Sequence, residues 1–365
     1  MKIVIGGDFS TYGKKVDVEP FSSEVIQLFK SADVSVVNLE SPIADNGDCP
    51  IKKAGPNIMM PSSSVQYLKD CGINLVTLAN NHFLDYGEIG VNKTISFLSQ
   101  LGFSYVGGGR TGDEIRKVCE IGNDIVILNY CESEFSVSKE VGSNPLDLIK
   151  VYSDVKKTIE TGKFVVVIVH GGHETYNLPS PRMQETYRFF IDLGVKVVVN
   201  HHQHCYSGFE SYHNGYIFYG LGNLFFPPIS KKCKPSWFTG YLLELIVSPE
   251  KNVNFKLHPY TQSIQPVSSV TLMDSSQKDT FNNDIEKLNS VISSPELIKH
   301  SFDSYVNKSL RYSILTKLSP YTGKLMLALC RRGFLPFLMG ESRRLRILNL
   351  IRCESHRDAC IQILS

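Results

Sequence analysis

The sequence lacks the features that mark secreted and membrane-spanning proteins. Its nine cysteines are irregularly spaced and odd in number, with no CxxC pair among them, which disfavours a disulfide scaffold. No apolar run reaches the roughly 18 residues that cross a bilayer. The apolar run after Met1-Lys2 is too short for the hydrophobic region of a signal peptide. These absences together predict a cytoplasmic protein in a reducing environment.

The sequence also lacks an excess of either charge. Its 38 Lys and Arg residues stand against 36 Asp and Glu residues, for a formal net charge of +2. This balance excludes a strongly basic nucleic-acid binder and an acidic disordered protein, so no nucleic-acid partner is expected. The content of 42% hydrophobic and 20% charged residues is ordinary for a globular protein. A chain of 365 residues can bury a large core without disulfides.

Short apolar runs alternate with helix-like segments up to about residue 205. Most of these runs are continuous, which is typical of strands buried on both faces. Four of the five helix-like segments end next to a glycine. Strands are expected at residues 2–7, 35–40, 74–79, 124–130, 163–170 and 196–200, and helices at 22–32, 62–71, 91–101, 147–161 and 182–193. This alternation predicts a layered α/β domain.

The remainder of the chain shows two different sequence patterns. Residues 215–262 contain no helix-like segment, and strands expected at 216–219, 241–247 and 254–260 predict an antiparallel section. Residues 263–365 are first rich in Ser, Asn and Asp and then show amphipathic helical patterns. The chain is therefore predicted to consist of an α/β domain over residues 1–262 and a mainly helical extension over residues 263–365.

The end of the chain is basic. Residues 321–365 hold eight Lys and Arg and three Asp and Glu, and Arg331-Arg332 and Arg343-Arg344 are interleaved with Leu, Phe and Ile. The favoured interpretation is a helical cap on the core with a solvated basic face. The alternative is a peripheral contact with an anionic membrane or with a synthase, made through residues 321–365.

Chemically active side chains follow several of the predicted strands. They are Asp8, Glu40, Asn81 with His82, His170, and His202 with His204. Because strand ends meet at one edge of an α/β layer, these residues can converge on one crevice. Carboxylate, amide and imidazole groups suit Mn, Fe or Zn, and the absence of Cys from the set argues against a structural zinc site.

Each of these residues also has an ordinary interpretation by itself. An Asp or Glu after a strand commonly caps a helix or shapes a turn, and a lone histidine is more often a packing residue than a ligand. The run His201-His202-Gln203-His204 is harder to explain in this way, because packing several imidazoles together costs desolvation. The recurrence of such residues at successive strand ends favours a single site.

Several motifs resemble those of one known family. They are Gly6-Gly7-Asp8, Asn38-Leu39-Glu40-Ser41-Pro42, Asn80-Asn81-His82 with Asp85-Tyr86-Gly87, Gly107-Gly108-Gly109, His170-Gly171-Gly172-His173-Glu174, His202-Gln203-His204 and Gly222-Asn223, in this order. On these residues the chain resembles the CapA-type proteins of capsule and poly-γ-glutamate synthesis, which look like calcineurin-like metallophosphoesterases. The resemblance spans residues 3 to about 226. It implies a metallophosphoesterase-like α/β/β/α sandwich.

Three positions depart from the family's motifs. Gly171 stands where the family has tryptophan, Asn200 stands where it has glycine, and Ser10 stands where the wider superfamily has a histidine ligand. The first two departures bear on the shape of the substrate site. The third bears on whether two metal ions bind, although CapA-type proteins commonly lack that histidine.

The resemblance implies that the polar residues hold one or two divalent metal ions, Mn, Fe or Zn. Glu40 would bridge the two ions. The other ligands would be Asp8 and His204 for the first ion, and Asn81, His170 and His202 for the second. Two cations activate water as a nucleophile at neutral pH and neutralise the charge that develops in the transition state.

Other residues of the shared motifs are expected to support catalysis. His82 would serve as the acid for the leaving group or as a clamp on the substrate anion, while Glu174 and Asp85 would lie just outside the ligands. Asp85 is expected either to orient His82 or to cap the helix that starts near Gly87. Asn223 is expected either to hydrogen-bond a ligand or to shape a turn.

Two neighbouring histidines are not expected to be ligands. His201 precedes His202 at a strand end, so its side chain should point to the opposite face and be structural. The spacing of His173 from His170 differs from that of the family's ligands, and His173 is expected at the surface or in the pocket.

The function that the resemblance implies is that of a metal-dependent hydrolase. Its substrate would be a small-molecule or polymer-intermediate anion with a phosphoester or related group, in capsule or cell-envelope polymer synthesis. One alternative is amide chemistry on a γ-glutamyl chain, in which the metals would polarise a carbonyl group. Another is a non-catalytic accessory scaffold of a polymer synthase, which the replacement of histidine by Ser10 and the basic tail support.

Overall fold

The chain forms two compact units, Met1–Ile298 and Lys299–Ser365. The computed structural model describes residues 1–12, 19–53, 55–137, 140–228, 233–263, 269–310, 324–332, 334 and 340–352. The first unit contains every strand of the described residues and continues past residue 262.

The first sheet has eight strands in the order β16-β15-β14-β1-β2-β3-β4, with β13 also paired to β1. Strands β1 to β4 and β13 are parallel, and β14 to β16 add an antiparallel section beside β1. The bounds are β1 (Lys2–Phe9), β2 (Val34–Leu39), β3 (Leu75–Thr77), β4 (Ser104–Val106), β13 (Asn223–Phe225), β14 (Thr239–Val247), β15 (Val253–Ser263) and β16 (Ser269–Leu272).

The second sheet has six strands in the order β11-β12-β10-β9-β7-β6. Its four central strands are parallel, and both edge strands are antiparallel to their neighbours. The bounds are β6 (Cys119–Ile121), β7 (Ile125–Cys131), β9 (Phe164–His170), β10 (Val197–His201), β11 (Phe209–Tyr212) and β12 (Gly215–Phe218). A separate pair is formed by β5 (Gly108–Gly109) and β8 (Gly142–Ser143).

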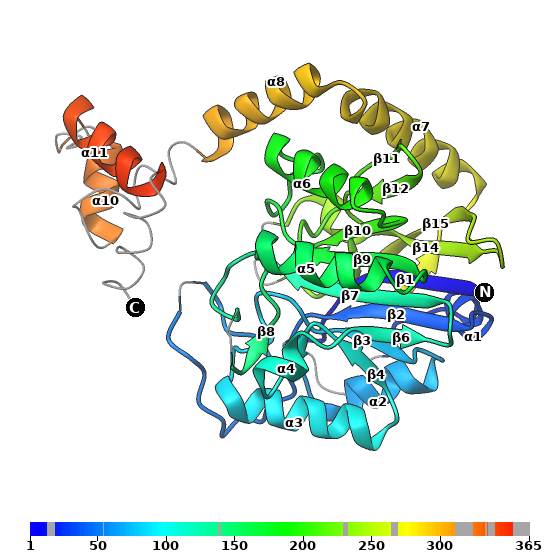
Figure 1. Cartoon of the computed structure of the whole chain (residues 1–365). Coiled ribbons are helices and arrows are strands. Elements are labelled where there is room, and N and C mark those ends of the chain that lie inside the picture. The colour runs from blue at the N-terminus through cyan, green and yellow to red at the C-terminus, as the bar shows by residue number, and fades with distance from the viewer. Residues whose placement is uncertain are drawn as a thin grey trace. The chain divides into compact units, whose positions relative to one another are not determined.

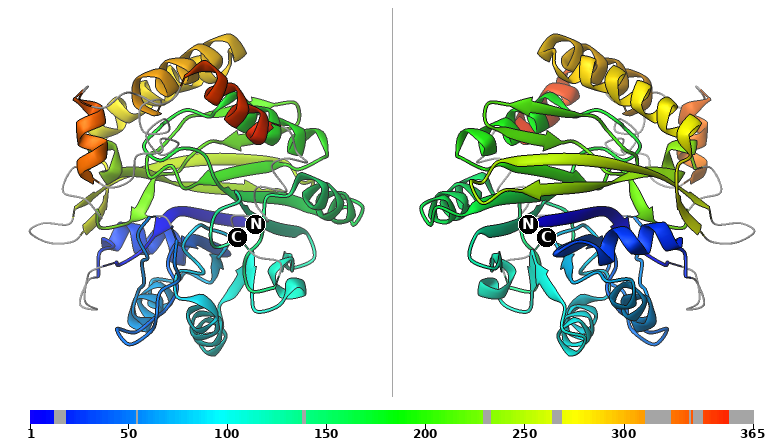
Figure 2. Two further views of the ribbon diagram at one scale, coloured as in Figure 1. Left: turned by 90° about the vertical axis from the view of Figure 1, so that its left-hand side faces the viewer. Right: turned by 90° about the vertical axis from the view of Figure 1, so that its right-hand side faces the viewer.

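The two sheets lie face to face between layers of helices (Figure 1 and Figure 2). The first sheet is covered by α1 (Ser23–Lys30), α2 (Ser62–Asp70) and α3 (Gly87–Gln100), and the second by α5 (Leu148–Ile159) and α6 (Pro181–Asp192). The short helices α4 (Gly112–Ile115) and η1 (Pro235–Phe238) lie in connections. The metallophosphoesterase-like α/β/β/α sandwich predicted from the sequence is confirmed.

Strand β1 shows how the layers are filled. Ile3 and Ile5 belong to the core between the sheets, while Val4 belongs to the core beneath the helices. From the second sheet, Val166 and Val199 also pack into the core between the sheets. Each such side chain contributes about 1.5–3 kcal/mol by leaving water. Burial on both faces explains why these strands read as unbroken apolar runs.

The helix starts follow from local sequence. Ser22, Asp147 and Ser180 precede α1, α5 and α6, and each side chain accepts a hydrogen bond from a backbone N–H of the first turn. These bonds satisfy donors that the helix itself leaves unpaired. Helix α3 begins at Gly87, four residues earlier than the predicted start at residue 91.

Three further differences from the sequence prediction concern strands. Strand β1 continues to Phe9, so Asp8 lies inside the strand opposite Asn38 and Asn223. The prediction that β12 forms an antiparallel section with β14 and β15 is wrong, because β12 lies in the second sheet, where it is parallel to β10 and antiparallel to β11. The edge strands β4, β6, β11 and β16 are not predicted, because segments this short carry little periodicity.

Gly7 allows β13 to approach β1 closely. A Cβ atom at Gly7 would lie 1.8 Å from the carbonyl oxygen of Gly222, so only glycine fits there. The backbone N–H of Asp8 donates to that same carbonyl oxygen at 3.3 Å. The contact fixes Asn223 beside Asp8.

Helix α7 (Ser275–Ile292) is packed into the first unit. Phe281 is 2% exposed and lies against Tyr206 and Tyr241, with ring centroids 5.1 and 5.7 Å away. The side chain of Asn289 accepts a hydrogen bond from the backbone N–H of Phe209 at 2.7 Å. The start of the predicted helical extension is therefore part of the core of the α/β sandwich.

The remaining described helices belong mainly to the second unit. Helix α8 (Pro295–Tyr305) begins at the boundary and continues into the π-helical turn η2 (Val306–Leu310). Helices α10 (Lys324–Arg331) and α11 (Glu341–Arg352) fall within the predicted basic tail, of which residues 321–323, 333, 335–339 and 353–365 lie outside the described residues. Among the helices described, none is both long and apolar enough to cross a membrane.

Phe281→Ala should destabilise the first unit by about 3 kcal/mol or more, because it opens a cavity beneath α7. Urea unfolding followed by circular dichroism measures the change. Lys278→Ala on the exposed side of the same helix is the control. Equal stability of the two variants would contradict the packing of α7 into the core.

Candidate metal centre

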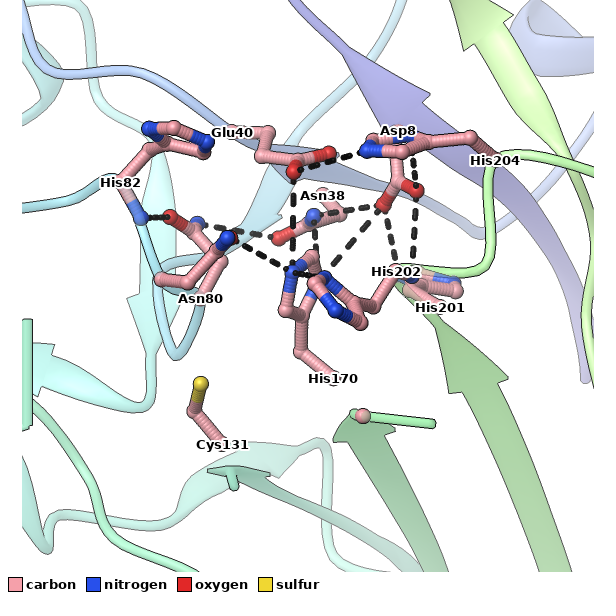
Figure 3. A network of polar contacts seen from close by, with 12 residues as sticks. Asp8, Asn38, Glu40, Asn80, His82, Cys131, His170, His201, His202 and His204 are labelled. Atoms are coloured by element: carbon pink, nitrogen blue, oxygen red, sulfur yellow. Dashed lines mark hydrogen bonds and ion pairs between the residues drawn. The ribbon is translucent and has the colours of Figure 1, made fainter. Parts of the chain in front are cut away.

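The carboxyl ends of strands from both sheets meet at one place. Asp8 lies near the end of β1, Glu40 follows β2, His170 ends β9, and His202 and His204 follow β10. All five side chains are at least nine-tenths buried, and Figure 3 shows them facing one another. The convergence that strand order predicts is therefore present.

Two groups of side chains in this cluster could hold a metal ion. One consists of Asp8, Glu40 and His204, and the other of Glu40, His170 and His202. Within each group, the candidate ligand atoms all lie within 4.8 Å of one another. Glu40 is common to both groups, which is the arrangement that the sequence resemblance implies for a bridging carboxylate.

In the group around His170, four polar atoms approach one another. The Nε2 atom of His170 lies 3.0 Å from Nδ1 of His202 and 3.6 Å from Oε1 of Glu40. The Oδ1 atom of Asn81 lies 3.0 Å from the same Nε2 atom. The predicted second ligand set, Asn81 included, is thus brought together.

In the other group, His204 lies between the two carboxylates. Its Nδ1 atom is 3.5 Å from Oδ2 of Asp8, and its Nε2 atom is 3.6 Å from Oε1 of Glu40. Ser10, at the position of the superfamily's histidine, is fully buried and its hydroxyl is 2.9 Å from that of Ser41. This group therefore has three candidate ligands, without the histidine that the wider pattern would add.

Of the two carboxylates in the two candidate ligand groups, Glu40 is the less satisfied. It is fully buried, and neither carboxylate oxygen has a hydrogen-bond partner in the described structure. Burial, and then the negative charge of Asp8, raises the pKa of Glu40 well above its usual value. A buried carboxylate without donors is costly unless a cation compensates it. The residues present therefore fit divalent metal ions.

The charge states of Asp8, His170 and His202 also suit cation binding. Burial alone would raise the pKa of Asp8, but the hydrogen bond with His204 and the nearby histidines outweigh it and lower that pKa. Burial, and then the neighbouring His204, lowers the pKa of His202 to about 4. Burial also lowers the pKa of His170. Neutral imidazoles and an ionised Asp8 are the forms that bind metals.

The backbone after β10 is held in an unusual conformation. His202 and His204 have positive φ angles of 89° and 53°, which L-residues rarely adopt. The backbone N–H of His202 donates to Oδ2 of Asp8 at 3.1 Å, across a separation of 194 residues. Such strain is concentrated at functional sites, where the surrounding structure maintains it.

Two asparagines orient the candidate ligands. The Nδ2 atom of Asn38 donates to Oδ1 of Asp8 at 2.7 Å and lies 3.2 Å from Nδ1 of His170 (Figure 3). The Oδ1 atom of Asn223 lies 2.8 Å from Nδ1 of His204. Of the two roles expected for Asn223, the hydrogen bond to a candidate ligand is confirmed. Asn38 was not singled out, although its position two residues before Glu40 is visible in the sequence.

His82 is held by Asp85 at the margin of the cluster. The Nδ1 atom of His82 is 2.7 Å from Oδ2 of Asp85, which also accepts a hydrogen bond from the backbone N–H of Ile58 at 2.7 Å. Asp85 therefore orients His82, whereas helix α3 has no side-chain cap. This arrangement leaves Nε2 of His82 as the ring nitrogen available to a substrate.

Lys53 is a member of this group that the sequence did not reveal. Its Nζ atom is hydrogen-bonded to Oδ1 of Asp85 and lies 3.2 Å from Nδ1 of His82. The side chain of Lys53 is only 4% exposed and that of Asp85 is fully buried. Lysine is almost never buried without a partner, so the pair is a built part of the site.

The other predicted residues lie around the cluster. Glu174 is exposed in the loop after β9, and its charge adds to the effects of burial and Asp8 on the pKa of Glu40. His173 is partly buried in the same loop. The Nδ1 atom of His201 lies 3.8 Å from Oδ1 of Asp8, so the prediction that His201 points away is wrong. Strand β10 ends at His201, and strand alternation does not extend across the turn that follows.

Two buried cysteines lie near the cluster without belonging to it. Cys131 pairs with His170 in the sheet register, and Figure 3 shows its thiol apart from the converging groups. Burial raises the pKa of Cys131 well above its usual value and raises that of Cys205 to about 12. Both remain neutral thiols, which are poor metal ligands.

Asn200, which replaces a glycine of the family, hydrogen-bonds the backbone at the ends of β9, β10 and β12. Its Nδ2 atom donates to the backbone carbonyl oxygens of Gly171, His201 and Tyr219 at 2.9, 2.8 and 3.2 Å. Its Oδ1 atom accepts a hydrogen bond from the hydroxyl of Tyr187 at 2.6 Å. These bonds fix the strand ends on which the histidines are placed.

Gly171, which replaces a tryptophan of the family, makes room for Glu132. A Cβ atom at Gly171 would lie 2.7 Å from Cγ of Glu132. Glu132 accepts a hydrogen bond from the backbone N–H of Gly172 at 3.2 Å and pairs with Arg182. The wall of the site next to His170 is therefore lined by a charged pair in this protein.

The geometry of the cluster agrees with the comparison to known families. Residues 3–228 match the model of a family described as bacterial capsule synthesis protein PGA_cap. The chain belongs to this family. The matched region contains all the strand ends of the candidate metal centre and confirms the resemblance inferred from the sequence motifs.

The names of individual relatives also refer to capsule or PGA biosynthesis. The chain is 30% identical over 232 residues to the capsule biosynthesis protein CapA of Bacillus anthracis, covering 60% of this chain and 56% of that protein. It is 29% identical over 232 residues to the PGA biosynthesis protein CapA of Bacillus subtilis, covering 59% of this chain and 60% of that protein. The matched segments thus span less than two thirds of these relatives.

A solved structure of a hypothetical protein from Thermus thermophilus is 12% identical with a TM-score of 0.45. The match covers 72% of this chain and 100% of that one. A probable polyglutamine synthesis accessory protein of Mycobacterium tuberculosis is 27% identical over 212 residues, covering 53% of this chain and 56% of that protein.

Glu40→Gln should stabilise the metal-free protein and abolish its response to metals. The raised pKa means that folding favours protonated Glu40. The contribution of Glu40 to the free energy of unfolding is therefore fully present below pH 4.5, and it is lost as the pH rises through the pKa of Glu40 in the folded protein. At pH 8 the metal-free variant should melt at a higher temperature than metal-free wild type. Added Mn²⁺ or Zn²⁺ should raise the melting temperature of wild type and of the exposed control Glu88→Gln only.

Lys53→Met should destabilise the protein by about 3 kcal/mol, because it leaves the charge of Asp85 buried without its partner. The double variant Lys53→Met with Asp85→Asn should lose less than the sum of the single losses. Chemical denaturation of the four proteins gives the coupling energy. Additive losses would show that the two side chains do not interact.

Proposed function

We propose that this protein is a metal-dependent hydrolase that acts on a phosphoester or related anionic intermediate in capsule or cell-envelope polymer synthesis. The observation that carries the proposal is Glu40, a buried carboxylate without hydrogen-bond donors that two groups of candidate ligands share. Membership of the PGA_cap family supports the polymer context. The cytoplasmic location predicted from the cysteines is part of the proposal, and Cys49, Cys71, Cys119, Cys131, Cys205 and Cys233 are free thiols.

The site would hold one or two divalent ions of Mn, Fe or Zn. Mixed carboxylate, amide and imidazole ligands suit these borderline metals. The ligands would be Asp8, Glu40 and His204 for one ion, and Glu40, Asn81, His170 and His202 for the other. Bound cations would lower the pKa of water and neutralise negative charge on the reacting group.

The protein's own residues would orient the substrate and move protons. Asp85 holds His82 through Nδ1, so Nε2 of His82 would transfer a proton to the leaving group or hydrogen-bond the substrate anion. Asn38 and Asn223 would keep Asp8 and His204 in place. Glu174, exposed beside the cluster, would lie on the substrate's side.

An amide hydrolase or transferase is the second candidate function. The names of two relatives, which refer to PGA biosynthesis and to polyglutamine synthesis, favour it. The same ligands would serve either reaction, because carbonyl and phosphoryl groups both develop negative charge on oxygen. A third candidate, an accessory scaffold, corresponds to the word accessory in the name of the Mycobacterium protein.

Turnover of model substrates in the presence of Mn²⁺ distinguishes these candidates. The purified protein should hydrolyse an aryl phosphodiester or monoester, and Glu40→Gln and His202→Ala should each lower the rate about a hundredfold or more. Glu88→Gln should leave it unchanged. Activity only on γ-glutamyl anilides would move the assignment to amide chemistry. Absence of both activities with metals bound would favour the scaffold.

A further inference from the structure

The positive charge of the chain is concentrated at its end. Residues 321–365 hold eight Lys and Arg and three Asp and Glu, whereas residues 1–320 hold 30 Lys and Arg and 33 Asp and Glu. The small positive net charge of the whole chain therefore comes entirely from the last 45 residues. The α/β sandwich and the tail have opposite net charge.

The same segment exposes large apolar side chains. In the described part of α10, α11 and the intervening chain these are Leu325 (72%), Met326 (39%), Phe334 (72%), Leu345 (58%), Leu348 (43%) and Ile351 (56%). Elsewhere in the described structure, exposed apolar residues of this size are spread over a far longer stretch of chain. Such a concentration is typical of an interaction surface.

Basic and apolar side chains are interleaved along the helix. In α11, Arg344 and Arg346 are exposed on either side of Leu345, and Leu348 and Ile351 follow at helical spacing. Exposed Arg332 lies between the apolar residues of α10 and Phe334. The cationic and apolar groups therefore lie within the same short stretch of chain.

We propose that the α10–α11 segment binds the surface of an anionic lipid bilayer. A bilayer offers phosphate charges to the arginines and, directly beneath them, an apolar layer to the leucines and Phe334. A nucleic acid or other soluble polyanion would pair with the arginines but would leave the apolar side chains in water. The charge of residues 1–320 would hold the sandwich itself off an anionic surface.

This attachment would keep the protein at the membrane without using any residue of the metal centre. None of the residues that carry the proposal belongs to the first compact unit. Membrane binding and hydrolysis therefore succeed or fail independently. An enzyme so attached would meet lipid-linked or membrane-extruded anionic polymer intermediates.

Sedimentation of the full-length protein with vesicles tests the proposal. Vesicles of phosphatidylcholine with about one third phosphatidylglycerol should sediment the protein, and phosphatidylcholine alone should not. Raising the salt from about 0.1 M to 1 M should weaken binding, because the arginines are exposed and become screened. Failure to bind the anionic vesicles at low salt would overturn the proposal.

Two double variants separate the electrostatic contribution to vesicle binding from the apolar contribution. Arg344→Glu with Arg346→Glu, and Leu345→Glu with Leu348→Glu, should each weaken vesicle binding about tenfold or more. The matched controls are Lys278→Glu with Lys299→Glu, and Ile149→Glu with Leu297→Glu, all exposed outside the segment. Both should bind as wild type does. Weakened binding in the arginine pair alone would indicate a general polyanion surface and would overturn the bilayer as the partner.

Discussion

The buried carboxylate of Glu40 is the constraint on which the site depends. An ionised carboxylate in a dry interior needs hydrogen-bond donors or a cation, and the described structure supplies Glu40 with no donor. Its neighbours are Asp8, which adds negative charge, and histidines whose ring nitrogens converge on it. The ionised carboxylate is therefore costly in the metal-free protein, where its raised pKa favours the protonated form, and a bound cation would remove that cost.

The fold maintains this arrangement through contacts that are distant in sequence. Two sheets direct parallel strand ends to one edge, and the ends of β1, β2, β9 and β10 each contribute one or two candidate ligands. Gly7 lets Asn223 lie beside Asp8, and Asn200 joins the loops that follow three strands of the second sheet. Strained backbone at His202 and His204 is held by these contacts. These contacts fix the positions of the candidate ligand side chains, as the binding of two cations bridged by one carboxylate would require.

Strand positions, the layered fold and the candidate ligands could be predicted because they follow from local patterns and from recognisable motifs. The contacts of Asn38 and Lys53 could not, since they span 29 residues or more and only the folded chain brings the partners together. The same applies to the parallel pairing of β12, which depends on its neighbour β10. His201 was misplaced because strand alternation was extended to a residue at which the strand ends.

Anomalous X-ray diffraction from crystals of the protein grown with Mn²⁺ tests the central claim most directly. The account predicts two peaks in the anomalous difference map, one on each side of the Glu40 carboxylate. One should lie among Asp8, Glu40 and His204, and the other among Glu40, His170 and His202. A single peak would limit the site to one metal ion. Peaks only elsewhere, or a water-filled or protonated Glu40 site without any peak, would contradict the account.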